Sequence, residues 1–157
     1  MDQPETPEDR LRDPVASHLG YMLRRASAVV MARLGEALAE IGLRPVEGTI
    51  LTLVGANPGC IQSDLGRMLG IKRANMVPLI AALASKGLLE KSPVDGRSLA
   101  LSLTGAGEAA RARVDAIMAA NEARFEGLLA GQDGAALRSA LRSALRLIAE
   151  AGDGRAD

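Results

Sequence analysis

Apolar residues at helical spacing are the dominant pattern of this chain, and they begin near its N-terminus. They recur at intervals of three and four residues at Leu19, Leu23, Ala26, Val30, Leu34, Leu38 and Ile41. This period predicts one amphipathic helix of about 25 residues, roughly 37 Å long at ~1.5 Å per residue. Gly42 follows as a C-terminal cap. A stripe of this length exceeds what a small domain covers by itself, so it predicts a partner surface.

Shorter helices and two strands are predicted in the middle of the chain. Pro45 suits a first helical turn, and helices are expected over 46–54, 63–69 and 73–85, the last one ended by Gly87. The runs 88–91 and 99–103 indicate strands around a polar loop at 92–98. Helix, Leu-Gly-Ile turn, helix and then a two-stranded ribbon is the order of a helix-turn-helix with a β-wing. Such a unit can place a helix and a ribbon in adjacent grooves of one DNA duplex.

Two more helices are predicted after the wing. Thr104 begins the first as its cap, with Glu108 in its first turn, and the glycine-containing segment 131–134 interrupts it. The last helix is amphipathic through Leu137, Leu141, Leu145 and Ile148. We therefore predict a mainly α fold with a small β-wing, a winged helix-turn-helix flanked by dimerisation helices. The expected divisions are a disordered acidic arm at 1–14, an N-terminal dimerisation helix at 15–44, the DNA-binding domain at 45–104 and C-terminal dimerisation helices at 105–152.

Composition changes this picture little. Hydrophobic residues make up 48% of the 157 residues and aromatic residues 1%, so a packed core is expected from aliphatic side chains. The formal net charge is zero, which gives no overall nucleic-acid signature. The first 14 residues hold five acidic side chains against two arginines, a balance of −3, so the remainder carries +3.

The few reactive side chains exclude several classes of site. Cys60 is the one cysteine and His18 the one histidine, so neither an intrachain disulfide nor a Cys/His zinc cluster can form. No assembled nucleophile or phosphate-binding loop is visible, and we expect a protein that is not an enzyme and carries no cofactor. No apolar run is long enough to span a membrane and the N-terminus is acidic, which predicts a soluble cytoplasmic protein.

Three segments in order resemble the MarR family of bacterial transcriptional regulators. The first is QSDLGRMLGI at 62–71, the second is KGLLEK at 86–91, and the third is DGRS at 95–98 followed by LSLTGAG at 101–107. The similarity extends from about residue 18 to about residue 147. It implies a homodimer that binds a pseudo-palindromic double-stranded DNA operator, usually as a repressor released by a small ligand.

The chain departs from the family pattern at two positions. Gly66 stands where the family usually has alanine, which keeps a close helix contact but weakens the helix by up to ~1 kcal/mol. Pro78 falls inside the expected recognition helix, where it removes the hydrogen bond to the carbonyl of Ala74. Pro78 is either a neutral variant of the family pattern or a residue that changes how the helix lies in the DNA groove.

The helix period indicates which side of the expected recognition helix faces DNA. Met76, Ile80 and Leu83 share a core face with Ile71, which leaves the other side of the helix for DNA. Asn75 can pair with adenine and Val77 can touch a thymine methyl group. Arg97 suits a narrow minor groove, and Asp95 is expected to orient it. The full set expected at the DNA is Gln62, Ser63, Lys72, Arg73, Ala74, Asn75, Val77, Lys91, Asp95, Arg97 and Ser98.

The start of the first helix is the expected effector site. The segment HLGYMLRRAS at 18–27 resembles that of family members which sense aromatic acids or their coenzyme A thioesters. An arginine beside an apolar cleft suits a carboxylate or phosphate. The candidate residues are His18, Tyr21, Met22, Arg24 and Arg25. An exposed helix face with a snorkelling arginine pair explains the same residues.

Two alternative functions stay open at this point. Cys60 could serve as a thiol-based redox sensor, although no basic residue near it in sequence would lower its pKa. The same helices could also form a dimeric adaptor that does not bind DNA. An adaptor would have no need of Lys72 or Arg97, so a DNA gel shift distinguishes it from a regulator.

Overall fold

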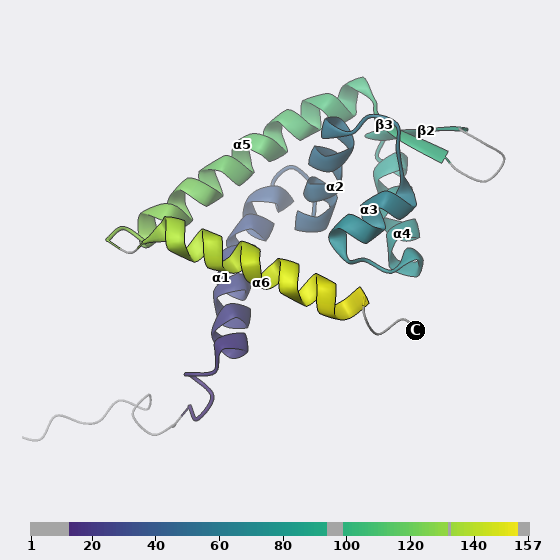
Figure 1. Ribbon diagram of the computed structural model, residues 1–157. Coiled ribbons are helices and arrows are strands. Elements are labelled where there is room, and N and C mark those ends of the chain that lie inside the picture. The colour runs from purple at the N-terminus through teal and green to yellow at the C-terminus, as the bar shows by residue number, and fades with distance from the viewer. Residues whose placement is uncertain (1–12, 94–98, 132, 154–157) are drawn as a thin grey trace, which may run out of the picture. The chain divides into compact units, whose positions relative to one another are not determined.

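The computed structural model describes residues 13–93, 99–131 and 133–153, which form two compact units (Figure 1). The first unit contains the described residues up to Ile117 and the second those from Met118 onward. The elements are α1 (Leu19–Ala39), α2 (Pro45–Ala56), β1 (Cys60–Ile61), α3 (Gln62–Leu69), α4 (Arg73–Ser85), β2 (Leu89–Pro93), β3 (Leu99–Leu103), α5 (Gly105–Leu128) and α6 (Gly134–Asp153). The predicted fold class, mainly α with a small β-wing, is confirmed.

Helix α1 is shorter than the hydrophobic period predicted, with 21 residues rather than about 25. A separate turn precedes it, in which the N–H of His18 donates to the carbonyl of Val15 at 2.9 Å. His18 itself is extended, with ψ of 122°, and this backbone conformation ends the turn before the helix begins. Apolar residues before Leu19 therefore do not belong to α1.

Glycine ends three helices of the first unit in the same way. Gly42, Gly70 and Gly87 have φ values of 72°, 64° and 70°, in the left-handed region that favours glycine. After each glycine the next N–H returns to the last turn of the helix, as in Leu43 to Leu38 at 3.0 Å and Leu88 to Leu83 at 3.0 Å. These are Schellman caps, and they fix where the chain leaves α1, α3 and α4. The predicted cap roles of Gly42 and Gly87 are confirmed.

The small sheet is antiparallel with strand order β1-β3-β2. Leu89 pairs with Leu103 and Lys91 with Leu101 in the β2–β3 hairpin, and Cys60 pairs with Leu101 from the other side. The two-residue strand β1 was not predicted from the sequence. Figure 1 shows α2, α3 and α4 gathered beside this hairpin within the first unit.

An aliphatic core holds the first unit together. Its completely or almost completely buried side chains come from α1 to α5 and the sheet, namely Leu38, Ile50, Leu51, Val54, Leu65, Met76, Ile80, Leu83, Leu101 and Val114. The core face predicted for the recognition helix, Met76, Ile80 and Leu83, is confirmed, whereas Ile71 is only half-buried. Nowhere in the ranges that the structure describes is a helix both long and apolar enough to cross a membrane.

The second unit is a helical hairpin made by the end of α5 and by α6. Gly131 turns the chain with a φ of 89°, and Asp133 caps α6 by accepting the N–H of Ala136 at 2.9 Å. Arg138 of α6 forms ion pairs with Glu122, at 3.5 Å, and with Glu126 of α5. The predicted break between these two helices is confirmed, but it begins earlier than expected, because α5 ends at Leu128 and Gly134 already belongs to α6.

Candidate nucleic-acid interface

A groove of about 730 Å³ lies between α3, α4 and the sheet. Its lining combines short polar side chains, basic side chains and apolar ones, and comprises Ile61, Gln62, Ser63, Gly66, Arg67, Gly70, Ile71, Lys72, Arg73, Met76, Val77, Lys91, Leu99 and Leu101. Six of the residues expected at DNA therefore line one groove: Gln62, Ser63, Lys72, Arg73, Val77 and Lys91.

The positive charge of this groove is largely free of acidic partners. Lys72, Arg73 and Lys91 are exposed, and no acidic group among the described residues lies within ion-pair distance of them. Arg67 is different, because Asp64 accepts its guanidinium N–H at 2.6 Å. Unpaired ammonium and guanidinium groups on a concave surface provide a site for phosphate oxygens.

Helix α4 separates its buried and exposed residues along its length. Arg73, Ala74, Asn75 and Val77 are all exposed, and Lys72 is the exposed N-cap. Val77 is 49% exposed, which is high for an apolar side chain and leaves it free to contact another molecule. Ala74 and Asn75 do not line the groove, since the helix turns them away from Arg73. Pro78 lies one turn after Ala74 on the exposed surface.

The start of α3 contributes the second polar edge of the groove. Gln62 is half-buried and Ser63 is exposed, both in the first turn, where backbone N–H groups are free to meet an anion. Gly66 lets α3 approach the following turn, because a Cβ there would lie 3.0 Å from the carbonyl oxygen of Ile71. Arg67 was missed by the sequence interpretation, although its spacing of four residues from Ser63 places the two on one helix face.

The wing is described only along its strands. Lys91 is exposed on β2 and lines the groove. Asp95, Arg97 and Ser98 lie outside the described residues, so their expected roles at DNA stay predictions.

The expected effector residues gather at the N-terminal end of α1. Arg24 and Arg25 both lie over the ring of Tyr21, with guanidinium carbons 5.3 Å and 5.8 Å from its centre. Arg25 also lies 3.7 Å from the carboxylate of Asp13. His18 is the exposed N-cap residue and Met22 is exposed. The structure thus brings an aromatic ring and two cations together, which suits an anionic ligand with an apolar body.

Cys60 has the wrong environment for a reactive thiolate. Burial raises the pKa of its thiol, and the negative charge of Asp64 raises it further. The thiol form is then favoured at neutral pH, and only the thiolate reacts readily with oxidants. This argues against redox sensing through Cys60.

Comparison with known proteins gives one consistent result. The MarR family model matches residues 41–98. The HTH-type transcriptional repressor Rv2887 of Mycobacterium tuberculosis is 32% identical over 108 residues, which are 68% of this chain and 78% of that protein. The transcriptional repressor CouR bound to a 23-mer DNA duplex is 38% identical, with a TM-score of 0.75 over 88% of this chain and 98% of that one. CouR bound to p-coumaroyl-CoA is 35% identical, with a TM-score of 0.75 over 88% and 97%.

These relatives are transcriptional regulators and not enzymes, which agrees with the non-catalytic protein expected from the sequence. The helix order, the wing and the sequence identity all lead to one assignment. The chain belongs to the MarR family of transcriptional regulators.

Proposed function

We propose that the protein is a homodimeric repressor that leaves its operator when an anionic aromatic acid, or the coenzyme A thioester of one, binds. The observation that carries the DNA-binding half of this proposal is the basic groove between α3, α4 and the sheet. It is supported by the 38% identity to CouR, which was solved on a DNA duplex.

The expected DNA contacts divide into two tasks in this proposal, one for residues of the groove and one for the exposed face of α4. Lys72, Arg73 and Lys91 neutralise phosphates, and Gln62 and Ser63 at the start of α3 donate to phosphate oxygens. The exposed outer face of α4 reads bases, through Asn75 and Val77 beside Ala74. Asp95, Arg97 and Ser98 are assigned to the wing contact with the minor groove on the sequence alone.

Dimerisation is assigned to residues 15–44 and 105–152. Large apolar side chains remain exposed on α1, including Leu19 at 69% and Val29 at 59%. On α6, Leu145 and Ile148 are exposed at 67% and 68%. Apolar faces of this kind at both ends of a chain are expected to be covered by a second copy.

The effector assignment rests on the α1 cluster. Tyr21 and Met22 supply an apolar wall, and Arg24 and Arg25 supply cations for the acid group or for the phosphates of coenzyme A. His18 completes the polar edge. CouR, which shares the fold, was solved with p-coumaroyl-CoA bound.

DNA binding is tested by recovering the DNA fragments that the purified full-length protein retains from a random-sequence library. The recovered operator is then titrated at fixed salt with the variant Lys72→Ala/Arg73→Ala and with Arg113→Ala, an exposed arginine of α5 outside the groove. We expect the groove variant to lose at least tenfold in affinity and to show a shallower salt dependence, since it neutralises fewer phosphates. Equal affinity of both variants and the wild type would contradict the assignment of the groove.

Release is tested by adding p-coumaroyl-CoA, p-coumarate or salicylate to the operator complex. A ligand that releases the protein must bind the free protein more tightly than the DNA-bound form. We expect Arg24→Ala/Arg25→Ala to lose several-fold to hundred-fold in ligand affinity at unchanged operator affinity. If no compound of this panel displaces DNA or raises the melting temperature, the effector class is wrong and the DNA-binding assignment is unaffected.

A further inference from the structure

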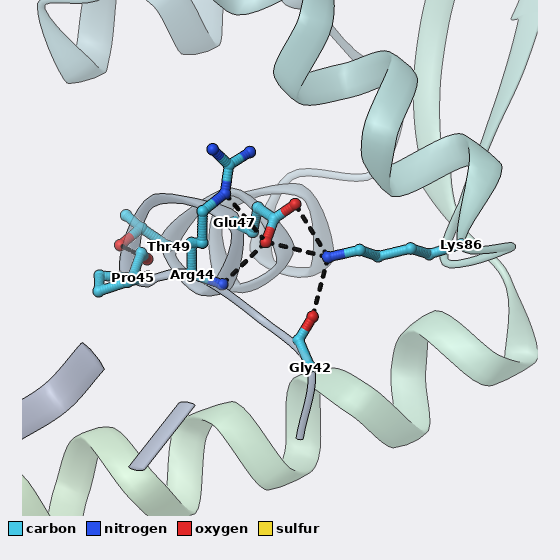
Figure 2. A network of polar contacts seen from close by, with 6 residues as sticks. All are labelled: Gly42, Arg44, Pro45, Glu47, Thr49 and Lys86. Atoms are coloured by element: carbon cyan, nitrogen blue, oxygen red, sulfur yellow. Dashed lines mark hydrogen bonds and ion pairs between the residues drawn. The ribbon is translucent and has the colours of Figure 1, made fainter. Parts of the chain in front are cut away.

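Glu47 is the one charged residue that is buried among the described residues, with a relative exposure of 1%. Its carboxylate lies in the first turn of α2 and accepts the backbone N–H of Arg44 at 2.8 Å. Lys86 Nζ donates to both of its oxygens at 3.0 Å (Figure 2). Burial by itself raises the pKa of the Glu47 carboxyl, but the Arg44 N–H and the Lys86 ammonium outweigh it and hold the pKa below its ordinary value.

Lys86 joins three parts of the first unit at one point. It is the C-cap residue of α4, so its backbone is the end of the recognition helix. Beyond its two contacts with Glu47, its ammonium also donates to the carbonyl oxygen of Gly42 at 2.9 Å, in the turn between α1 and α2. Its three N–H groups therefore have three acceptors.

The geometry of this contact differs in kind from the packing around it. Met76, Ile80 and Leu83 hold α4 against the core by apolar contacts, which are non-directional and tolerate small rotations of a helix. An ammonium held by three oxygens tolerates much less movement, because each hydrogen bond has a preferred length and angle. Neither Glu47 nor Lys86 lines the groove, so any effect of theirs on DNA must act through the placement of α4.

We propose that Glu47 and Lys86 are positioning residues, which fix the end of the recognition helix to the α1–α2 turn and so set the operator spacing that the dimer reads. The inference rests on the proposed function, in which two copies of α4 enter successive major grooves about one helical turn apart. A buried ion pair contributes little net stability compared with apolar residues of similar shape. Here its contribution is the orientation of α4.

The test is the double variant Glu47→Gln/Lys86→Met, which keeps the side-chain shapes and an acceptor for the Arg44 N–H but removes the ion pair. Arg44→Ala is the matched control, because that guanidinium reaches the same carboxylate, at 3.6 Å, from an exposed position, and Arg44 lies beyond the end of α1, whose exposed apolar side chains support the proposed dimer. Each protein is titrated with the operator recovered from the library and with derivatives that have one or two base pairs inserted or deleted at the centre. Thermal unfolding is measured on the same samples.

We expect the double variant to unfold within a few degrees of the wild type but to lose at least tenfold in affinity at the original spacing. Its affinities for the altered spacings should fall less, so the preference for one spacing flattens. The control should keep the wild-type preference. If the double variant does not fold, Glu47→Gln alone provides the measurement, since the half-exposed Lys86 can then hydrate.

A double variant that keeps both the wild-type affinity and the wild-type spacing preference would overturn the inference. A uniform loss at every spacing, together with a lower melting temperature, would also overturn it, because that result indicates a stabilising role only. If the wild type retains no specific DNA from the library, the proposed function itself has failed, which is a different outcome.

Discussion

Gly107 occupies a place in α5 where even a methyl group does not fit. A Cβ built on it would lie 2.0 Å from the carbonyl oxygen of Leu88 and 3.3 Å from the Cβ of Leu103. The oxygen belongs to the backbone at the start of the β2–β3 hairpin, and it already accepts the N–H of Thr104 at 3.2 Å. Neither side of the contact is a flexible side-chain end, so Gly107→Ala must separate α5 from the wing.

The size of the effect follows from this distance. Real Cβ contacts essentially never fall under 3.0 Å, so the two backbones must part by about 1 Å (3.0 − 2.0). Such overpacking costs ~1–3 kcal/mol, and loss of the Thr104 hydrogen bond adds ~0.5–1.5 kcal/mol. The higher helix propensity of alanine than of glycine offsets up to ~1 kcal/mol of this loss. Because backbone atoms form both sides, we expect a net loss of about 2–4 kcal/mol, which lowers the melting temperature by roughly 4–16 °C.

Gly105→Ala is the matched control, since its Cβ would meet nothing within 4 Å. We expect that variant to unfold at the wild-type temperature or slightly above it. Both are measured by circular dichroism at one protein concentration, because the proposed dimerisation would make the melting temperature concentration-dependent. The steric argument is refuted if Gly107→Ala unfolds within about one degree of the Gly105→Ala variant.

Four further measurements test other parts of the structure. Thr104→Ala should lose ~1–2 kcal/mol in urea unfolding, because the hydroxyl accepts the Gly107 N–H at 3.0 Å as the cap of α5, and Thr104→Ser should recover most of this loss. Pro78→Ala should gain ~1–3 kcal/mol in the same assay, because the missing N–H of an interior helix turn is restored; a lower stability would contradict this. The folded-state pKa of Glu47 is lowered, so its carboxylate contributes fully to the free energy of unfolding at neutral pH, and this contribution is lost as the pH falls through the acidic range. The difference in stability between the wild type and Glu47→Gln should therefore narrow on acidification. A constant difference in unfolding measured at several pH values would contradict this prediction. Leu141→Asp should weaken the proposed dimer by placing a charge on the apolar face of α6, and sedimentation at micromolar concentration should then show monomer. An unchanged dimer would contradict the assignment of α6 to the interface.

The extent of α4, the expected recognition helix, was predicted correctly because its signals are local. The N-terminal Lys72, the apolar spacing of Met76, Ile80 and Leu83 and the stop at Gly87 all lie within one short segment. The same holds for the cap at Thr104 and for the start of α6 after Gly131. Where a boundary depended on φ and ψ of a single residue, as at His18, the hydrophobic period alone was wrong by a turn.

The candidate interface was predicted in part. Helix periodicity separates the buried side of α4 from the exposed side that carries Arg73 and Val77, and this holds in the structure. It could not show that Lys91, from a strand, shares a groove with Ser63 and Lys72, because that depends on how the sheet packs against α3 and α4. Strand β1 was missed because two residues are too few for any period, and only pairing with β3 defines it.

The sequence by itself determined the order of the elements other than β1, the family and most of the basic residues, since each follows from the types and spacing of residues close together in the chain. Only the tertiary structure decided which residues distant in the sequence contact one another. Glu47 and Lys86 are 39 residues apart, and their hydrogen bonds exist only because folding brings the first turn of α2 to the end of α4. The steric limit at Gly107 likewise arises from the carbonyl of Leu88, which local sequence pattern does not place near it. Local preferences fix the helices and turns, and only the packed chain fixes which polar groups lose water and must find partners.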